Sequence, residues 1–238
     1  MAEDHGLAEL AALRQKHDKQ QALSETVYYT LREAIIRNLL LPGSVMNERA
    51  LAQVLRVSRT PVRDALRQLT IEGFLTGIPR QGLIVTDLNL KDIEEIYTMR
   101  AALEGAAARM SAQTISPSEL VLIEDVCAQM ATAVAHNDVE RFSALNRRFH
   151  EILCSTARNR RLTEQVLRLY DAVRPICLAV FADRARAHKS LQEHEALVAA
   201  IGRRDPDEAE RLAREHMTQS MLIQMRLHQL KHLDLVTR

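Results

Sequence analysis

The stretch NERALAQVLRVSRTPVRDALRQLTIEG, from Asn47 to Gly73, holds two short helical patterns in succession. Apolar residues recur at helical spacing within 50–55 and again within 62–69, with a short break between them. Asn47 and Ser58 stand just before the two patterns, and both residue types favour the N-cap position of a helix. The stretch therefore predicts two helices joined by a three-residue turn.

Arginines collect on the second of these helices. Arg59, Arg63 and Arg67 are four residues apart, which places them in one stripe along the helix. A helix pair with a basic stripe on its second member suits insertion of that helix into the major groove of DNA. The alternative is a solvated arginine face on an ordinary helical hairpin.

The charge of the whole chain is nearly balanced, at +1 with a pI near 7.8. Residues 49–80, however, carry six arginines and two acidic residues, so the rest of the chain is slightly acidic. Such an asymmetry favours one basic module, suited to nucleic acid, on a neutral body.

The composition predicts a mainly α protein of one or two domains. The chain has 238 residues, of which 47% are hydrophobic, with only seven glycines and six prolines. Cys127, Cys154 and Cys177 lie far apart, as expected of buried reduced thiols in a reducing cytoplasm. No apolar run approaches the roughly 20 residues that span a bilayer, and the start of the chain lacks a signal-peptide pattern. We therefore expect a cytoplasmic protein without a membrane partner.

The segments on either side of the helix pair complete a domain over residues 21–88. A helix is expected from Leu23 to about Leu40, whereas residues 1–20 read as a polar N-terminal arm without an assigned function. Residues 74–85 contain two short β-type runs around a turn with proline and glycine, which predicts a hairpin. One helix, a helix-turn-helix and a hairpin make a winged helix-turn-helix.

The run PGSVMNERALAQVLRVSRTPVRDALRQLTIEGFLTGIPRQGLIV, residues 42–85, resembles the DNA-binding domain of GntR-type bacterial transcription regulators. The resemblance implies an operator of double-stranded DNA as partner. Arginines at the start of the recognition helix can also form paired hydrogen bonds with guanine, which agrees with this implication. Arg67 lies one turn deeper and is expected either to contact a phosphate or to be solvated. The residues that the resemblance places at DNA are Arg49, Arg59, Arg63 and Gly82, followed by Ser58, Thr60 and Arg80.

Residues 89–238 predict an antiparallel bundle of six helices. Each helix is expected to begin at a capping residue or a capping box, and Pro175 is expected to kink the fourth. The expected starts are Asn89, the capping box Ser116–Glu119, Asn137-Asp138, Asn159, a second capping box Ser190–Glu193, and Asp205-Pro206.

Three of the nine histidines, His150, His194 and His216, lie inside predicted bundle helices. Asn146 precedes His150 by four residues, so these two side chains share one helix face. Neutral imidazoles from three helices and an amide oxygen could hold one divalent cation. The alternative is that these histidines are ordinary polar or core residues.

The segments MRAALEGAAARM, LNRRFHEIL, LQEHEALVAAI and DEAERLAREHM resemble the C-terminal effector domain (FCD) of FadR-type regulators, and the helix count resembles the VanR-like subgroup. The resemblance implies a divalent metal, such as zinc or nickel, bound by Asn146, His150, His194 and His216. Asn146 departs from the commoner aspartate, so the metal would keep its full charge, bind more weakly and depend more on an anionic ligand. Arg100 is implied to bind an effector carboxylate, and its alternative is an exposed salt bridge with Glu104.

These patterns together predict a homodimeric transcriptional repressor whose operator affinity is changed by a small carboxylate. One alternative is a metal sensor that needs no organic effector. Another is a metal-dependent hydrolase. Glu151 and Glu193 are the nearest candidate bases, but each is adjacent in sequence to a ligand and is expected to turn to another face.

Overall fold

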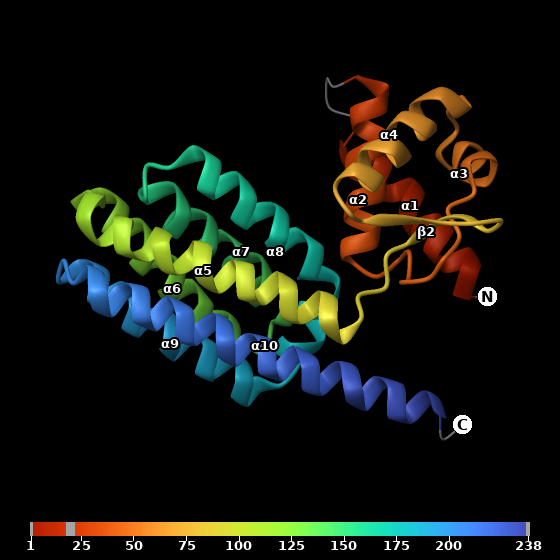
Figure 1. Cartoon of the computed structure of the whole chain (residues 1–238). Helices are drawn as coiled ribbons and strands as arrows, with labels where there is room; N and C mark the ends of the chain where they lie inside the picture. Colours follow the sequence, from red (N-terminus) through yellow and green to blue (C-terminus); the bar gives the residue numbers. More distant parts are fainter. Residues whose placement is uncertain (1, 18–21, 237–238) are drawn as a thin grey trace. The chain divides into compact units, whose positions relative to one another are not determined.

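The computed structural model describes residues 2–17 and 22–236 of the chain. It divides into two compact units, Met1–Asp87 and Leu88–Arg238, close to the boundary expected at residue 88 (Figure 1). Among the described helices, none is long and apolar enough to cross a membrane.

The first unit has the elements of a winged helix-turn-helix, as predicted. The helix-turn-helix consists of α3 (Glu48–Leu55) and α4 (Arg59–Ile71), and the hairpin of β1 (Leu75–Ile78) and β2 (Gly82–Val85). The two strands are antiparallel, with Leu75 opposite Val85. They are preceded by α1 (Ala2–His17) and α2 (Leu23–Ile36).

The described part of the expected N-terminal arm is the helix α1, which joins the core of this unit. Leu10 and Leu13 are buried in the same apolar cluster as Val27 of α2 and Leu55 of α3. The guanidinium of Arg14 also donates a hydrogen bond to the carbonyl of Leu55 at the end of α3. Residues 1 and 18–20 of the expected arm lie outside the described residues.

α3 and α4 differ in how their ends are formed. The side chain of Asn47 accepts hydrogen bonds from the backbone N–H groups of Arg49 and Ala50, both at 3.0 Å, so the predicted cap forms. Ser58 stands at the N-cap position of α4, but its hydroxyl makes no capping bond. Gly73 adopts a φ of +84° just after α4, which a side chain would disfavour and glycine allows.

The second unit consists of six helices within the described residues, in agreement with the predicted bundle. In Figure 1, α5 and α10 run antiparallel and side by side, and they share more contacts than any other pair of helices. Asn89 caps α5 and the capping box Ser116–Glu119 forms, both as predicted, and Asn89 additionally forms a capping box with Asp92. The helices are α5 (Leu90–Thr114), α6 (Pro117–Ala135), α7 (Val139–Thr156), α8 (Arg160–Phe181), α9 (Arg184–Gly202) and α10 (Pro206–Val236).

The predicted start of the fifth bundle helix at Ser190 is wrong. α9 begins at Arg184, where the carboxylate of Asp183 accepts hydrogen bonds from the N–H groups of Ala185 and Arg186. Ser190 is therefore a buried residue inside the helix rather than its cap. α8 is one helix that includes position 175, and the kink expected at Pro175 stays a prediction.

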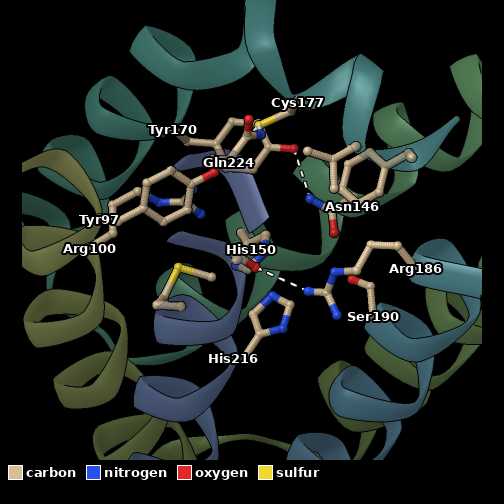
Figure 2. A pocket seen from close by; sticks show the side chains of 14 residues that line it. Tyr97, Arg100, Asn146, His150, Tyr170, Cys177, Arg186, Ser190, His216 and Gln224 are labelled. Atoms are coloured by element: carbon tan, nitrogen blue, oxygen red, sulfur yellow. Dashed lines mark hydrogen bonds between the residues drawn. The ribbon is translucent and has the colours of Figure 1, made fainter. Parts of the chain in front are cut away.

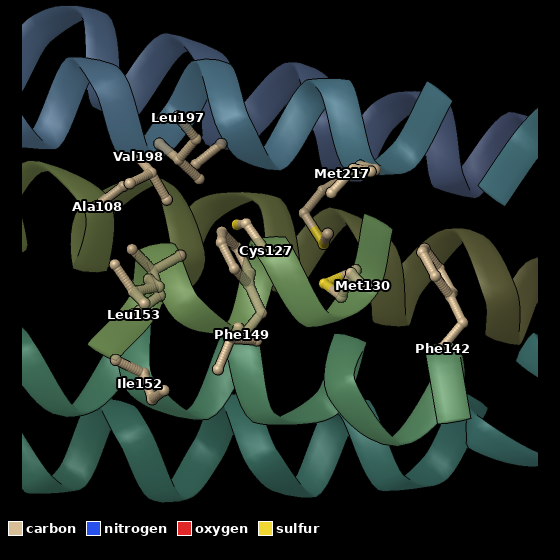
Figure 3. Close-up of a cluster of buried hydrophobic side chains, with 14 of the residues drawn as sticks. Ala108, Cys127, Met130, Phe142, Phe149, Ile152, Leu153, Leu197, Val198 and Met217 are labelled. Atoms are coloured by element: carbon tan, nitrogen blue, oxygen red, sulfur yellow. The ribbon is translucent and has the colours of Figure 1, made fainter. Parts of the chain in front are cut away.

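The apolar core of the bundle surrounds a group of polar side chains. Phe149, Leu153 and Met130 are among its fully buried members (Figure 3). The three cysteines are buried and unbridged, as expected of reduced thiols. Phe149 and His150, consecutive residues of α7, are both buried, so this helix contributes to the apolar core and to the polar group inside it.

Candidate functional site

The first candidate site, the helix-turn-helix surface, lies on α3, α4 and the hairpin. All seven residues predicted to contact DNA are exposed, so their side chains are available to a large partner. Arg56 adopts a left-handed conformation with a φ of +51° in the turn, and only three residues separate the end of α3 from the start of α4. The surface is defined by Arg49, Ser58, Arg59, Thr60, Arg63, Arg80 and Gly82.

Glu48 positions one of these residues and was not singled out from the sequence. Its carboxylate lies 2.9 Å from Nε of Arg59, and the Arg59 side chain remains 66% exposed. The contact links the first turn of α3 to the first turn of α4. It thereby orients the Arg59 guanidinium while leaving part of its donor set free.

The hairpin tip holds its two predicted residues in unusual backbone conformations. Arg80 has a φ of +68° and Gly82 a φ of +90°, and both are exposed. Nothing lies within 4 Å of the position that a Cβ atom would take at Gly82. The backbone there is open to close approach by another molecule.

The second candidate site, the histidine pocket, is inside the bundle. His150 of α7, His194 of α9 and His216 of α10 each offer one ring nitrogen to a group whose members all lie within 4.8 Å of one another. All three histidines are buried, and the Nε2 atoms of His194 and His216 are 3.1 Å apart. The three histidines therefore converge, as the sequence predicts.

Two carboxylates contact the Nδ1 atoms of two of these histidines. Nδ1 of His216 donates a hydrogen bond to Oε2 of Glu193 at 2.7 Å. Oε2 of Glu104 lies 2.5 Å from Nδ1 of His150, as a close charge contact rather than a well-aligned hydrogen bond. A carboxylate at Nδ1 turns Nε2 of the same ring toward the opposite side, and this arrangement is common among histidines that bind metals.

The electrostatic environment keeps these carboxylates ionised. Burial alone would raise the pKa of Glu104, but the nearby Arg100 and then the contact with His150 lower it to about 2. Burial likewise opposes ionisation of Glu193, while hydrogen bonds from His216 and Arg186 lower its pKa to about 2.

The same environment disfavours charge on the histidines. Burial lowers the pKa of His194 well below its ordinary value, and the neighbouring histidines lower it further. The His194 ring stacks on the ring of Phe149, with the two ring centroids 3.9 Å apart. Burial also lowers the pKa of His216 against the opposing effect of Glu193. A neutral imidazole is the form that binds a metal ion.

Asn146 lies one turn before His150 on α7 and lines the same pocket. Its amide nitrogen donates a hydrogen bond to the hydroxyl of Tyr170 at 2.9 Å (Figure 2). Its Oδ1 is buried and has no hydrogen-bond partner among the described residues. An amide oxygen without a partner beside three imidazoles fits the donor set of a divalent ion such as zinc or nickel.

Arg100 lines the pocket, and it also makes the salt bridge that was considered as its alternative. Its Nε lies 2.8 Å from Oε1 of Glu104, but the two side chains are only 3% and 1% exposed. The expectation of an exposed pair is therefore wrong, because both residues face the interior of the bundle. Nη2 of Arg100 is buried without a hydrogen-bond partner among the described residues, so it can still bind a ligand.

Two family models match the chain. One, described as "Bacterial regulatory proteins, gntR family", covers residues 23–85, and the other, described as "FCD domain", covers residues 95–219. The chain belongs to the GntR family of bacterial regulatory proteins, with an FCD domain.

Similar proteins agree with this assignment. The regulator is 29% identical to the "Uncharacterized HTH-type transcriptional regulator YdhC" of Bacillus subtilis (strain 168). The match extends over 203 residues and covers 84% of this chain and 90% of YdhC. It is 26% identical to the "HTH-type transcriptional repressor RspR" of Escherichia coli, and this match covers 83% of the regulator and 86% of RspR. The solved structure "E. coli McbR/YncC" has the same fold, with a TM-score of 0.76, 23% identity, and 88% and 100% of the two chains covered.

The GntR-family assignment makes this chain a transcriptional regulator with an effector-binding FCD domain, so the hydrolase alternative is dropped. The winged helix-turn-helix and the helical bundle are the two parts that the resemblance implied.

Sequence reasoning missed three residues of the regulator's pocket. Glu104 was considered only as an exposed partner of Arg100, and Glu193 was expected to face away from the histidines. The carboxylate of Glu193 does turn away from His194, its neighbour in sequence, but it accepts a hydrogen bond from His216 of α10. Arg186 was not considered because the predicted fifth bundle helix began after it. Asp183 followed by Ala187 and Leu191 at helical spacing was the available signal for the earlier start.

Proposed function

We propose that this regulator is a homodimeric repressor whose operator affinity changes when a small carboxylate binds in the histidine pocket. The carboxylate is held by a divalent metal and by Arg100. The observation that carries the proposal is the convergence of three buried histidines, two of them in contact with ionised carboxylates, beside a buried arginine with an unpartnered Nη2.

The metal ligands in this proposal are Asn146, His150, His194 and His216. When bound, the ion supplies a positive charge that attracts an anionic effector. Glu104 and Glu193 keep the imidazoles of His150 and His216 in place, and Arg100 donates hydrogen bonds to the effector's carboxylate.

The pocket also suggests how ligand binding reaches other parts of the bundle. Its lining comes from α5, α7, α8, α9 and α10, and the side chains leave a cavity of only about 20 Å³. Such a volume holds little more than one water, so an organic acid requires the lining helices to move. A ligand that prefers the moved arrangement shifts the equilibrium between the two states of the dimer, and operator affinity changes with it.

The helix-turn-helix surface reads the operator in this proposal. Arg59 and Arg63 contact base edges in the major groove, Arg49 a phosphate or a base edge, and Gly82 allows the hairpin tip to enter the minor groove. Ser58, Thr60 and Arg80 add contacts around them. Arg67 lies further along α4 and is exposed, which is compatible with a phosphate contact.

The test combines elemental analysis with operator binding by the full-length protein. An operator selected from randomised DNA is titrated with metal-free and metal-loaded protein, with and without a panel of short organic acids. The proposal expects an acid to change operator affinity only in the metal-loaded protein. A change on metal addition alone, with no effect of any acid, would instead support a metal sensor.

A further inference from the structure

Arg186 is a second buried arginine in the histidine pocket, and it lies away from Arg100. Figure 2 shows the two arginines on opposite sides of His150 and His216. Arg186 belongs to the first turn of α9 and is 8% exposed. Its guanidinium binds both carboxylate oxygens of Glu193, at 2.9 and 3.2 Å, and the hydroxyl of Ser220 at 3.3 Å.

The two arginines are embedded in matching chains of contacts. One chain runs from Arg100 through Glu104 to His150. The other runs from Arg186 through Glu193 to His216. Each arginine is therefore neutralised by one glutamate, so the four ionised groups together contribute no net charge.

The metal proposed for this pocket would then have an uncompensated charge of +2. The histidines bind it as neutral ligands, and the asparagine amide at position 146 also supplies no charge. A ligand aspartate would remove one positive charge, and a monocarboxylate effector the other. With Asn146, both negative charges must come from the effector, since a buried charge without compensation is strongly unfavourable.

The free hydrogen-bonding groups of the pocket also occur on two sides. Nη2 of Arg100 and Nε of Arg186 are both buried without hydrogen-bond partners among the described residues. Oγ of Ser190, on the α9 side, is likewise without one. Two separated acceptor groups on one ligand can satisfy donors on both sides, whereas a single carboxylate can reach only one.

We infer that the effector is a short dicarboxylate, with Arg100 and Arg186 each bound to one carboxylate and Asn146 setting the preference for two negative charges. The inference rests on the proposed function and narrows its ligand class. The small cavity favours a chain of few carbons over a longer acid.

The experiment is calorimetric titration of the full-length, zinc-loaded protein with acetate, malonate and sulfate, with zinc content checked afterwards. Acetate has one charge, malonate has two charges on two groups, and sulfate has two charges on one centre. We expect malonate to bind more tightly than either of the others by about tenfold or more. Equal affinities for acetate and malonate, or for sulfate and malonate, overturn the inference.

Two variants test the residues themselves. Asn146→Asp supplies the missing negative charge and should lower the malonate-to-acetate affinity ratio by about tenfold, and Arg186→Lys should lower it through loss of the paired geometry. Asn137→Asp makes the same change at an exposed position and should leave the ratio unaltered. An unaltered ratio in both pocket variants overturns the assignment of these residues. If none of the acids binds or changes operator affinity, the proposed function fails as well; if acetate acts as well as malonate, only the dicarboxylate inference fails.

Discussion

The helix-turn-helix surface and the histidine pocket both depend on arginines, but they place them in opposite environments. On the surface, Arg59 meets Glu48 while its side chain remains 66% exposed. In the pocket, Arg100 meets Glu104 with 3% and 1% of the side chains exposed. The same pair of residue types is therefore weakly held and available to a partner in one region, and fixed by its surroundings in the other.

The two regions also differ in how the chain builds them. The helix-turn-helix comes from one continuous stretch, so neighbours in sequence determine its geometry. The pocket collects side chains from five helices between positions 97 and 224. A change on the surface should therefore affect binding without affecting folding, whereas a change in the pocket should affect both.

The largest expected effect is on folding and comes from Glu104→Gln. This variant leaves the Arg100 guanidinium buried without its countercharge, which should lower the free energy of unfolding by about 3–5 kcal/mol. The matched variant Glu48→Gln removes the half-buried partner of the exposed Arg59 and should change the free energy of unfolding by less than about 1 kcal/mol. Urea unfolding of both full-length variants, followed by circular dichroism, measures the difference. Similar losses in the two variants would contradict the contrast between the regions.

A smaller effect is expected from zinc on thermal stability. An ion that binds only the folded protein stabilises it by about 2.7 kcal/mol when its free concentration is 100 times the dissociation constant. His194→Ala removes one of the converging ligands and should abolish the zinc-induced rise in melting temperature. His188→Ala, an exposed histidine on the same helix, should retain that rise. Each variant is compared with itself, without and with zinc, so a lower basal stability does not affect the comparison. An equal zinc-induced rise in melting temperature in both variants would rule out a metal site at His194.

The next effect is on operator affinity and not on stability. Arg63→Ala should weaken binding to a selected operator by about 1–3 kcal/mol and relax the preference at one base pair. Because Arg63 is exposed, the free energy of unfolding should change by less than about 0.5 kcal/mol. Arg148→Ala, which removes an exposed arginine from α7, is the control and should leave operator binding unchanged. If neither Arg59→Ala nor Arg63→Ala weakens binding, the assignment of α4 as the recognition helix is wrong.

The difference between the regions also explains what the sequence could predict. The cap at Asn47 and the hairpin depend on residues a few positions apart, and both were found from local patterns. The convergence of the three histidines was also expected, because each lies on a bundle helix and resembles a family position.

The charges around the histidines depend on long-range packing, and here the sequence was insufficient. Glu104 and His150 are 46 positions apart, and spacing alone does not bring them together. Ser190 and Glu193 have the spacing of a capping box, but the helix already continues upstream of them from Asp183. A capping box requires free N–H groups at a helix start, and inside α9 these groups are already paired. The misplaced start removed Arg186 from consideration as a pocket residue.

The smallest expected effect separates the N-cap residues of the two helices, since Ser58 belongs to the helix-turn-helix surface and Asn47 does not. Asn47 accepts hydrogen bonds from two backbone N–H groups of α3, whereas the hydroxyl of Ser58 makes no capping bond at α4. Asn47→Ala should therefore lower the free energy of unfolding by about 1 kcal/mol. Ser58→Ala should leave it unchanged within about 0.5 kcal/mol. Ser58→Ala should instead weaken operator binding, since its exposed hydroxyl remains free to contact DNA. Urea unfolding and operator titration of the same two proteins measure both quantities, and a larger stability loss for Ser58→Ala than for Asn47→Ala would show that Ser58 stabilises the helix.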